Sequence, residues 1–335
     1  MSALVVVAAG PLSTLQDAGR FGWQRFGVSP AGAMDAVAYA AANALAGNAP
    51  DVAAIEITLT GDTYEVEAES VRIAVAAAAA IVVDGVPAVG WRSFTLRRRQ
   101  RLVIGPVTHG TRGYVAVAGG FAVEPQLGSR SVHARTGVGG APLKAGDGLP
   151  LARARAPDAP DVKLDGLALP YVPLPIRVVL GPQDDHFTAR GIEAFLGGEY
   201  RVSAAADRMG YRLEGPEIEH AAGFDTISDG IVFGSIQVPG TRRPIVLMAD
   251  RQTSGGYPKI ATVASASLPT FAQLKPGDAL RFAAVAPAEA RELLRRQRAA
   301  LARLAPTPAC RDPRDLSSEA LLASNLIDGV VGPYD

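Results

Sequence analysis

The sequence has few of the side chains that hold metals or form disulfides. Its 335 residues include one cysteine, Cys310, which lies in a proline-rich tail and cannot form an internal disulfide. The four histidines are scattered along the chain, and no two stand at metal-ligand spacing. We therefore expect no metal site.

Three catalytic or nucleotide-binding motifs are also missing. No G-x-x-x-x-G-K-[ST] segment is present, which excludes a P-loop. The run Gly137–Gly140 lacks the strand-to-helix context of a dinucleotide fingerprint. A Gly-x-Ser-x-Gly elbow is absent as well, so a serine hydrolase of that type is not indicated.

Neither net charge nor long apolar runs point to nucleic acid or membrane. The 33 basic and 33 acidic residues cancel, so no global field attracts polyanions. The longest uncharged apolar run, Ile73–Val83, has about half the length needed to cross a bilayer. No basic residue precedes Leu4–Ala9, which favours a strand over a signal peptide. We expect a cytoplasmic protein.

Length and turn content predict two β-rich domains. A chain of 335 residues exceeds the usual size of one domain, and 36 glycines with 25 prolines imply many turns. Short β-type runs dominate, including a hairpin at Asp84-Gly85, and helical patterns cover only 33–45, about 185–196 and 287–304. The further predicted strands are 64–67, 71–75, 81–83, 102–104, 114–118, 176–180, 200–203, 231–238, 245–248, 260–264 and 280–282.

A proline-rich stretch divides the chain, and the two parts end alike. Leu143-Lys144-Ala145-Gly146-Asp147-Gly148-Leu149 is echoed by Leu274-Lys275-Pro276-Gly277-Asp278-Ala279-Leu280, which suggests a duplicated β domain. The pattern favours two small barrels or sandwiches over a parallel α/β sheet. We predict domains at 1–155 and 176–286, a linker at 156–175, and a C-terminal helix and tail at 287–335.

A glycine-punctuated loop in the first half carries Asp17 and Arg20 and leads into the first helical pattern. The start of that helix, near Ala31–Asp35, could offer amide groups to an anion. Alternatively, Asp35 only favours the helix dipole, and Asp17 pairs with Arg20 to fasten the loop. Both interpretations stay open.

Two further polar segments in the first half allow a structural or a functional interpretation. Glu56 stands in an apolar strand, so it needs a partner, Arg20 or backbone donors, unless it serves a site. The turn Leu127–Ser131 carries an arginine between polar, glycine-flanked residues. In contrast, we interpret Arg97–Arg101 as a solvated basic patch.

The densest polar cluster lies in the second half. It comprises Asp207–Gly215, with Arg208 and Tyr211, the strand residue Gln237, and the segment Met248–Lys259. Lys259 is one of only four lysines, and the Gly255-Gly256 turn lets backbone approach a ligand closely. Acidic, amide, hydroxyl and ammonium groups together suit a small amide or carboxylate. The segment contributes Asp250, Gln252, Thr253, Gly255, Gly256, Tyr257 and Lys259.

From about Leu12 to Phe282 the chain resembles the biotin-dependent carboxyltransferase-type family. Beyond the segments above, the matching residues include Tyr114–Gly120, Gly181-Pro182-Gln183 and Gln273–Asp278. The family's members include the C subunit of 5-oxoprolinase, allophanate hydrolase subunit 2 and an antagonist of a histidine-kinase inhibitor. The resemblance implies a mostly β protein with a few helices, built as two tandem cyclophilin-like β-barrel domains.

The resemblance also implies an enzyme subunit. We expect the C subunit of an ATP-dependent 5-oxoprolinase, acting with a B-type carboxyltransferase half and an A-type protein on the lactam. Nucleotide would bind by backbone and arginine contacts shared with the B-type partner. Lys259 and Arg208, with Arg20, would stabilise developing anionic oxygen, and Asp250 would transfer or orient a proton. The expected substrate-binding residues are Gln237, Gln252, Thr253, Gly255, Gly256, Tyr257, Tyr211, Asp17, Arg20 and Asp35.

Two alternatives remain. The chain could transfer a carboxyl group from carboxybiotin to a urea-like amide, in which case biotin arrives on another protein because no biotinyl-lysine segment is present. It could instead be a non-enzymatic module that binds a kinase-inhibiting partner. Such a module would not need Asp250 and Lys259 beside a Gly-Gly turn.

Overall fold

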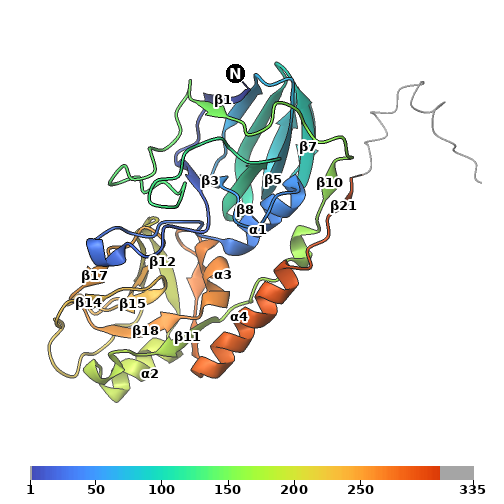
Figure 1. Cartoon of the computed structure of the whole chain (residues 1–335). Coiled ribbons are helices and arrows are strands. Elements are labelled where there is room, and N and C mark those ends of the chain that lie inside the picture. Colours follow the sequence, from blue (N-terminus) through green and yellow to red (C-terminus); the bar gives the residue numbers. More distant parts are fainter. Residues whose placement is uncertain (1, 310–335) are drawn as a thin grey trace, which may run out of the picture.

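The computed structural model describes residues 2–309; Cys310 and the rest of the predicted tail lie outside the described residues. The described chain forms two lobes, each built on one large β-sheet, with α4 running along the side of both (Figure 1). The prediction of a mostly β protein with a few helices and two barrels is confirmed. No helix of residues 2–309 is long and apolar enough to cross a membrane.

The first lobe holds an eleven-stranded sheet. Its strands are β1 (Ala3–Ala8), β2 (Ser13–Gln16), β3 (Ala54–Thr58), β4 (Thr63–Val66), β5 (Ser70–Val83), β6 (Val86–Val89), β7 (Arg92–Arg97), β8 (Arg101–Val117), β9 (Gly148–Pro150), β10 (Val162–Lys163) and β21 (Thr307–Pro308). The path β21-β10-β7-β5-β8-β4-β1-β9 is antiparallel throughout, and β5 and β6 form the predicted hairpin at Asp84-Gly85.

The second lobe holds an eight-stranded sheet and a two-stranded one. The large sheet contains β11 (Ile176–Leu180), β12 (Tyr200–Ala206), β13 (Gly210–Glu214), β15 (Ser235–Gln237), β16 (Ile245–Leu247), β18 (Lys259–Val263), β19 (Ala279–Leu280) and β20 (Phe282–Ala284). β14 (Asp229–Gly230) pairs with β17 (Ser254–Gly255). The edge strands of the large sheet, β19 and β20, are consecutive in the chain, so its two edges meet and the sheet curves into a barrel.

The helices are α1 (Ala36–Ala46), α2 (Ala189–Gly197), α3 (Leu268–Ala272) and α4 (Pro287–Leu301), with single turns η1 (Gln24–Phe26), η2 (Gly166–Ala168), η3 (Asp184–His186) and η4 (Ser265–Ser267). α1 begins later than expected from the sequence because Asp35 is its N-cap. The pattern over 185–196 is divided into η3 and α2 because Thr188 caps α2. On α4, Leu301 packs against the α1 cluster, and Gln297 donates to carbonyls of Pro170 and Ala266.

Several strand predictions differ from the structure. The predicted strands 71–75 and 81–83 belong to one long strand, β5, and the run predicted over 280–282 is divided between β19 and β20. The predicted strands 102–104 and 114–118 belong to one long strand, β8, which continues through Gly105, Pro106 and Gly110. The run predicted over 231–238 pairs within the barrel only at β15, because Gly234 has a left-handed φ of 88° that interrupts extended backbone.

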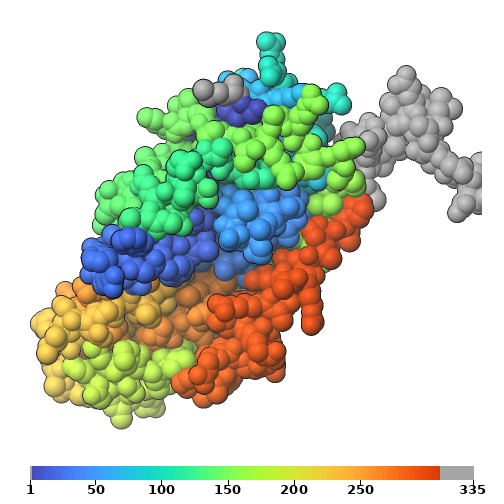
Figure 2. Space-filling view, viewed as in Figure 1, coloured from blue at the N-terminus to red at the C-terminus, as the bar shows by residue number. Residues whose placement is uncertain are grey.

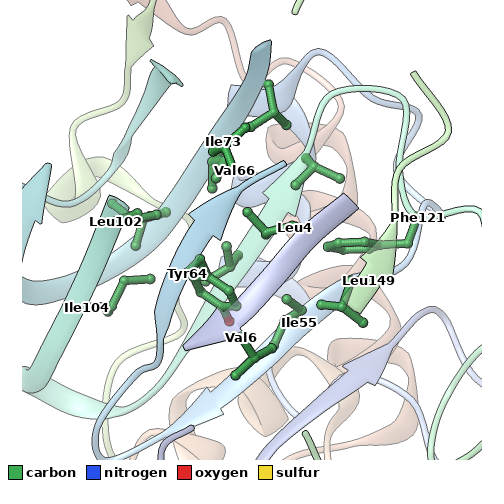
Figure 3. Packing of buried hydrophobic residues seen from close by; sticks show 14 of the residues in the cluster. Leu4, Val6, Ile55, Tyr64, Val66, Ile73, Leu102, Ile104, Phe121 and Leu149 are labelled. Atoms are coloured by element: carbon green, nitrogen blue, oxygen red, sulfur yellow. The ribbon is translucent and has the colours of Figure 1, made fainter. Parts of the chain in front are cut away.

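Both faces of β5 are buried over residues 71–77, which explains the alanines of that segment. Along β5, Ile73 and Val75 point into the barrel, while Ala74 and Ala76 point to the opposite face and pack against α1. Small side chains on that face let the alanine-rich helix approach closely. Inside the barrel, side chains from β1, β4 and β8 meet, with Tyr64 among them (Figure 3).

The repeated seven-residue segment forms the same turn in both lobes. The backbone amide of Lys144 donates to the Asp147 carboxylate at 2.9 Å, and that of Lys275 donates to the Asp278 carboxylate at 3.0 Å. The glycine between them has a φ of 92° in the first turn and 91° in the second. Each turn leads into a short strand. In the first lobe this strand is β9, which pairs with β1, and β1 pairs in turn with β4. In the second lobe it is β19, which pairs with β12, and β12 pairs in turn with β13. These parallels support the predicted duplication.

The two lobes are joined through a buried ionic network centred on Glu56. Ile55 and Ile57 point into the first barrel, so Glu56 between them points to the other face. Its carboxylate accepts from Arg208 of the second lobe, from Arg112 at 3.2 Å, from the Met34 amide at 2.9 Å and from the Tyr114 hydroxyl at 2.6 Å. Figure 2 shows the blue N-terminal part of the chain packed onto the yellow and orange second lobe.

Burial alone would raise the pKa of Glu56, but the guanidinium groups of Arg208 and Arg112 outweigh it, so the net pKa is lowered. Arg208 also binds Asp250 through two hydrogen bonds of 3.0 and 2.8 Å. The network therefore contains two carboxylates and two guanidiniums, and it is electrically balanced.

The repeated turns give a first prediction. Asp147→Ala and Asp278→Ala should each lower the free energy of unfolding by about 1 kcal/mol, because each removes a side-chain acceptor from the turn amide. Urea unfolding monitored by circular dichroism measures this. Asp158→Ala, at an exposed aspartate, is the control and should change little. Unequal effects in the two lobes would contradict the equivalence of the turns.

The Glu56 network gives a second prediction. Glu56→Gln leaves the buried guanidinium of Arg112 without a carboxylate, while Arg208 keeps Asp250, so the network has one uncompensated positive charge and we expect a loss of about 3–5 kcal/mol in the free energy of unfolding. Glu65→Gln, which removes a partly exposed pair with Arg101, should cost about 1 kcal/mol or less. Equal losses in the two variants, measured by denaturant unfolding, would show that the network does not hold the lobes together.

The lowered pKa of Glu56 predicts the pH dependence of this difference. Its contribution to stability is fully present above the ordinary value of 4.5 and is lost as pH falls through the lower pKa of the folded state. The stability gap between wild type and Glu56→Gln should therefore narrow on acidification below that value. Thermal unfolding of both proteins across the acidic range tests this, and a constant gap would contradict it.

Candidate functional site

A cavity of about 320 Å³ opens where the two lobes meet. The first lobe contributes the segment 27–29 and the loop 133–138, and the second contributes Met209 and the segment 250–252. Three hydrogen bonds from residues lining this cavity cross the lobes. Ser29 Oγ donates to the Ala249 carbonyl at 3.2 Å, His133 Nε2 lies 3.1 Å from the Asp250 carbonyl, and Arg135 donates to the Asp207 carboxylate at 3.3 Å. We call this space the seam cavity.

Arg208 and Asp250, both predicted as catalytic, do come together at the seam. Arg208 lies in the turn between β12 and β13. It donates to both carboxylate oxygens of Asp250, to one carboxylate oxygen of Glu56 and to the Gly32 carbonyl. Burial opposes the charge of Arg208, but Glu56 and Asp250 raise its pKa overall. Because both oxygens of Asp250 already accept from Arg208, this geometry suits orientation across the lobes better than proton transfer.

Lys259 lies in a different place, in the large sheet of the second lobe. It begins β18 opposite Gln237 of β15 and is almost completely buried, at 1% exposure. Its Nζ has no hydrogen-bond partner among residues 2–309; its nearest counter-charge is Asp229 Oδ2, at 3.4 Å. Asp229 is largely exposed. Its pKa is lowered mainly by the hydrogen bond from the Gly230 amide and to a smaller extent by Lys259. Lys259 is therefore a buried cation with donor capacity to spare.

The Gly-Gly turn packs against Gln237, the strand partner of this lysine. Gln237 Nε2 donates to the Tyr257 carbonyl at 3.3 Å, and a Cβ on Gly255 would stand 2.7 Å from that same nitrogen. Only glycine fits at this position without displacing Gln237. The Gly256 carbonyl accepts from the Thr226 amide, and the Thr253 carbonyl accepts from the Ile231 amide. The Tyr257 side chain is exposed. We call Lys259, Gln237 and this turn the lysine site.

The structure thus divides the predicted second-half cluster into two places. Gln252 lines the seam cavity with Asp250, whereas Gln237, Gly255, Tyr257 and Lys259 form the lysine site. Ile231 lies between them, because its carbonyl accepts from Arg251 and its side chain faces Gly255. The two places are neighbours separated by one stretch of chain.

Asp17 and Arg20 fasten a loop of their own lobe. Asp17 accepts from the hydroxyls of Ser129 and Ser131, each at 2.6 Å, and Arg20 donates to the carbonyls of Gln126, Ser129 and Ser131. Burial would raise the pKa of Asp17, but these hydroxyls and nearby amides lower it. The alternative of a mutual ion pair is therefore wrong: each side chain binds the 126–131 loop separately.

Asp35 and Tyr211 are also occupied by the protein itself. Asp35 caps α1 through the amides of Val37 and Ala38, and its other oxygen accepts from Gln273 and Tyr171. Burial raises its pKa in spite of these bonds. Tyr211 accepts from Arg112 and donates to a carbonyl of α3.

The backbone amides before α1 are not available to an external anion. The Met34 amide donates to the Glu56 carboxylate, and the Asp35 amide donates to the Tyr114 hydroxyl. Glu56 also finds its partners in Arg208 and Arg112, and not in Arg20 as the sequence suggested.

Sequence reasoning missed several residues of these places. Arg112, His133, Asp229 and Arg251 received no role. Arg112 could have been noticed as a charge within an apolar strand, whereas the other three depend on contacts between distant segments. Among residues 2–309 no cluster of three or more His, Cys, Asp or Glu side chains could hold a metal.

Comparison with known proteins identifies relatives of this architecture. The profile of the carboxyltransferase domain, subdomain A and B, matches residues 26–284. The 5-oxoprolinase C subunit of Escherichia coli (strain K12) is 36% identical, covering 83% of this chain and 90% of that protein. The 5-oxoprolinase C subunit of Haemophilus influenzae is 37% identical, covering 85% and 92%.

Longer proteins contain a similar unit. The urea amidolyase of Lachancea kluyveri is 32% identical over 89% of this chain but only 18% of that protein. The crystal structure of Kluyveromyces lactis urea carboxylase superposes with a TM-score of 0.83 at 31% identity, covering 89% of this chain and 29% of that one. The shared fold and the match over most of its length place this chain in the carboxyltransferase domain family, subdomain A and B.

Proposed function

We propose that this chain is the C subunit of an ATP-dependent 5-oxoprolinase that opens 5-oxo-L-proline to L-glutamate together with A and B subunits. The observation that carries the proposal is the match to two 5-oxoprolinase C subunits over at least nine-tenths of their length. In the urea amidolyase of Lachancea kluyveri, the similar unit is a fifth or less of the protein. The chain therefore matches nearly all of each 5-oxoprolinase C subunit but only a small part of the urea amidolyase.

The lysine site supplies chemistry that lactam opening needs. Water adds across the C–N bond of the ring, giving a carboxylate and an amine, while ATP is hydrolysed to ADP and phosphate. Negative charge develops on the lactam oxygen during this addition, and a buried ammonium with free donors stabilises such charge strongly. Lys259 is the residue proposed for this role, with Gln237 and Tyr257 beside it. Arg208 and Asp250 would hold the two lobes in position.

The test is glutamate release by purified A, B and C subunits supplied with ATP and 5-oxo-L-proline. We expect Lys259→Met to lower the rate by about 100-fold or more, the usual effect of removing a charge-stabilising donor. The free energy of unfolding should not fall, because the substitution removes an incompletely paired buried cation. Lys275→Met, at an exposed lysine, is the matched control. Full activity without this chain, or with Lys259→Met, would sink the proposal.

A second candidate function is carboxyl transfer from carboxybiotin to a urea-like amide. It is favoured by the 0.83 TM-score to the urea carboxylase of Kluyveromyces lactis. In that reaction the same lysine would hold an amide or carboxylate oxygen. Biotin-dependent incorporation of labelled bicarbonate into urea, with no glutamate release from 5-oxo-L-proline, would support this candidate over the first.

A further inference from the structure

Arg251 is a buried cation in the wall of the seam cavity, and the chain only partly satisfies it. It is 5% exposed. Its Nε donates to the Ile231 carbonyl at 3.3 Å, and its Nη1 donates to the carbonyls of Met248 and Ala249 at 3.3 and 3.4 Å. Within residues 2–309 its Nη2 has no hydrogen-bond partner, so donor capacity remains on a side chain that lines a cavity.

The charge of Arg251 has no counter-ion in the described part of the chain. No carboxylate there lies within ion-pair distance of it, and its neighbour Asp250 is bound on both oxygens by Arg208. Burial lowers the pKa of Arg251 to about 10, although Asp250 acts in the opposite direction. The guanidinium therefore stays charged at neutral pH. The guanidinium lies over the Phe233 ring, 5.8 Å from its centroid, but a buried charge without a counter-ion is costly, which favours a ligand that supplies the missing negative charge.

The rest of the seam cavity offers further donors. Arg135 is exposed, lines the cavity and forms only a surface pair of 3.3 Å with Asp207, while the exposed Gln252 forms no side-chain hydrogen bond within residues 2–309. The hydroxyls of Ser29 and Thr136 are committed to Ala249 and His133. A volume of about 320 Å³ is within the range of small-ligand pockets.

We propose that the seam cavity binds a small oxyanion, a carboxylate or a phosphate group, with Arg251 as its principal ligand. Guanidinium groups bind both kinds of oxyanion through charge-assisted hydrogen bonds. Gln252 and Arg135 would contact the anion from the rim of the cavity. This site is separate from the lysine site, and the inference does not depend on the proposed reaction.

Isothermal titration of the full chain with inorganic phosphate, and separately with L-glutamate, tests the proposal and distinguishes the two sources of oxyanion. Binding of either probe supports it. Arg251→Met should weaken that binding by about tenfold or more, the value of a charged hydrogen bond. Arg303→Met changes the net charge equally at an exposed arginine outside the cavity, and it should leave affinity unchanged.

Gln252→Glu is a second variant that leaves the buried core intact. It places a negative charge on the exposed rim of the cavity, so it should also weaken binding of the anion. Absence of binding by both probes at millimolar concentration would overturn the proposal. Equal affinity in wild type, Arg251→Met and Gln252→Glu would do the same, because the anion would then bind elsewhere.

Discussion

The docking of the two lobes depends on the buried carboxylate of Glu56. This carboxylate brings together guanidiniums from β8 and from the β12–β13 turn, and through Arg208 it reaches Asp250. Each charge in this network is nearly inaccessible to water, so each needs its partner in place. Because the partners come from both lobes, the ionic balance is complete only when the lobes are correctly docked. The seam is thereby specified by charge as well as by shape.

This constraint also separates structural from available charges. Arg208 and Asp250 neutralise each other within the network, whereas Lys259 and Arg251 are buried cations that retain unused donors. Arg251 donates to the Ile231 carbonyl, and the Ile231 side chain faces Gly255 of the lysine site. Unused donors on a buried cation can bind an oxygen atom of a ligand. The lysine site and the seam cavity each contain one such cation.

The family relationship is compatible with this division of roles. Two relatives named as 5-oxoprolinase C subunits match this chain over nearly their whole length, and urea amidolyases contain a similar unit within much longer chains. Lactam opening and carboxyl transfer to an amide both place negative charge on an oxygen next to a C–N bond. In the function proposed above, Lys259 would stabilise that charge in either reaction.

Local periodicity and turn chemistry are enough to predict the β-rich class, the repeated Gly-Asp turn and the segments in which polar residues cluster. The grouping of these residues was decided only by tertiary structure. Asp250 and Lys259 are nine residues apart, yet one meets Arg208 at the seam and the other pairs with Asp229 of the two-stranded sheet. Likewise, Glu56 pairs with a residue 152 positions away. Such pairings follow from how sheets curve and dock, and no local pattern in the chain encodes them.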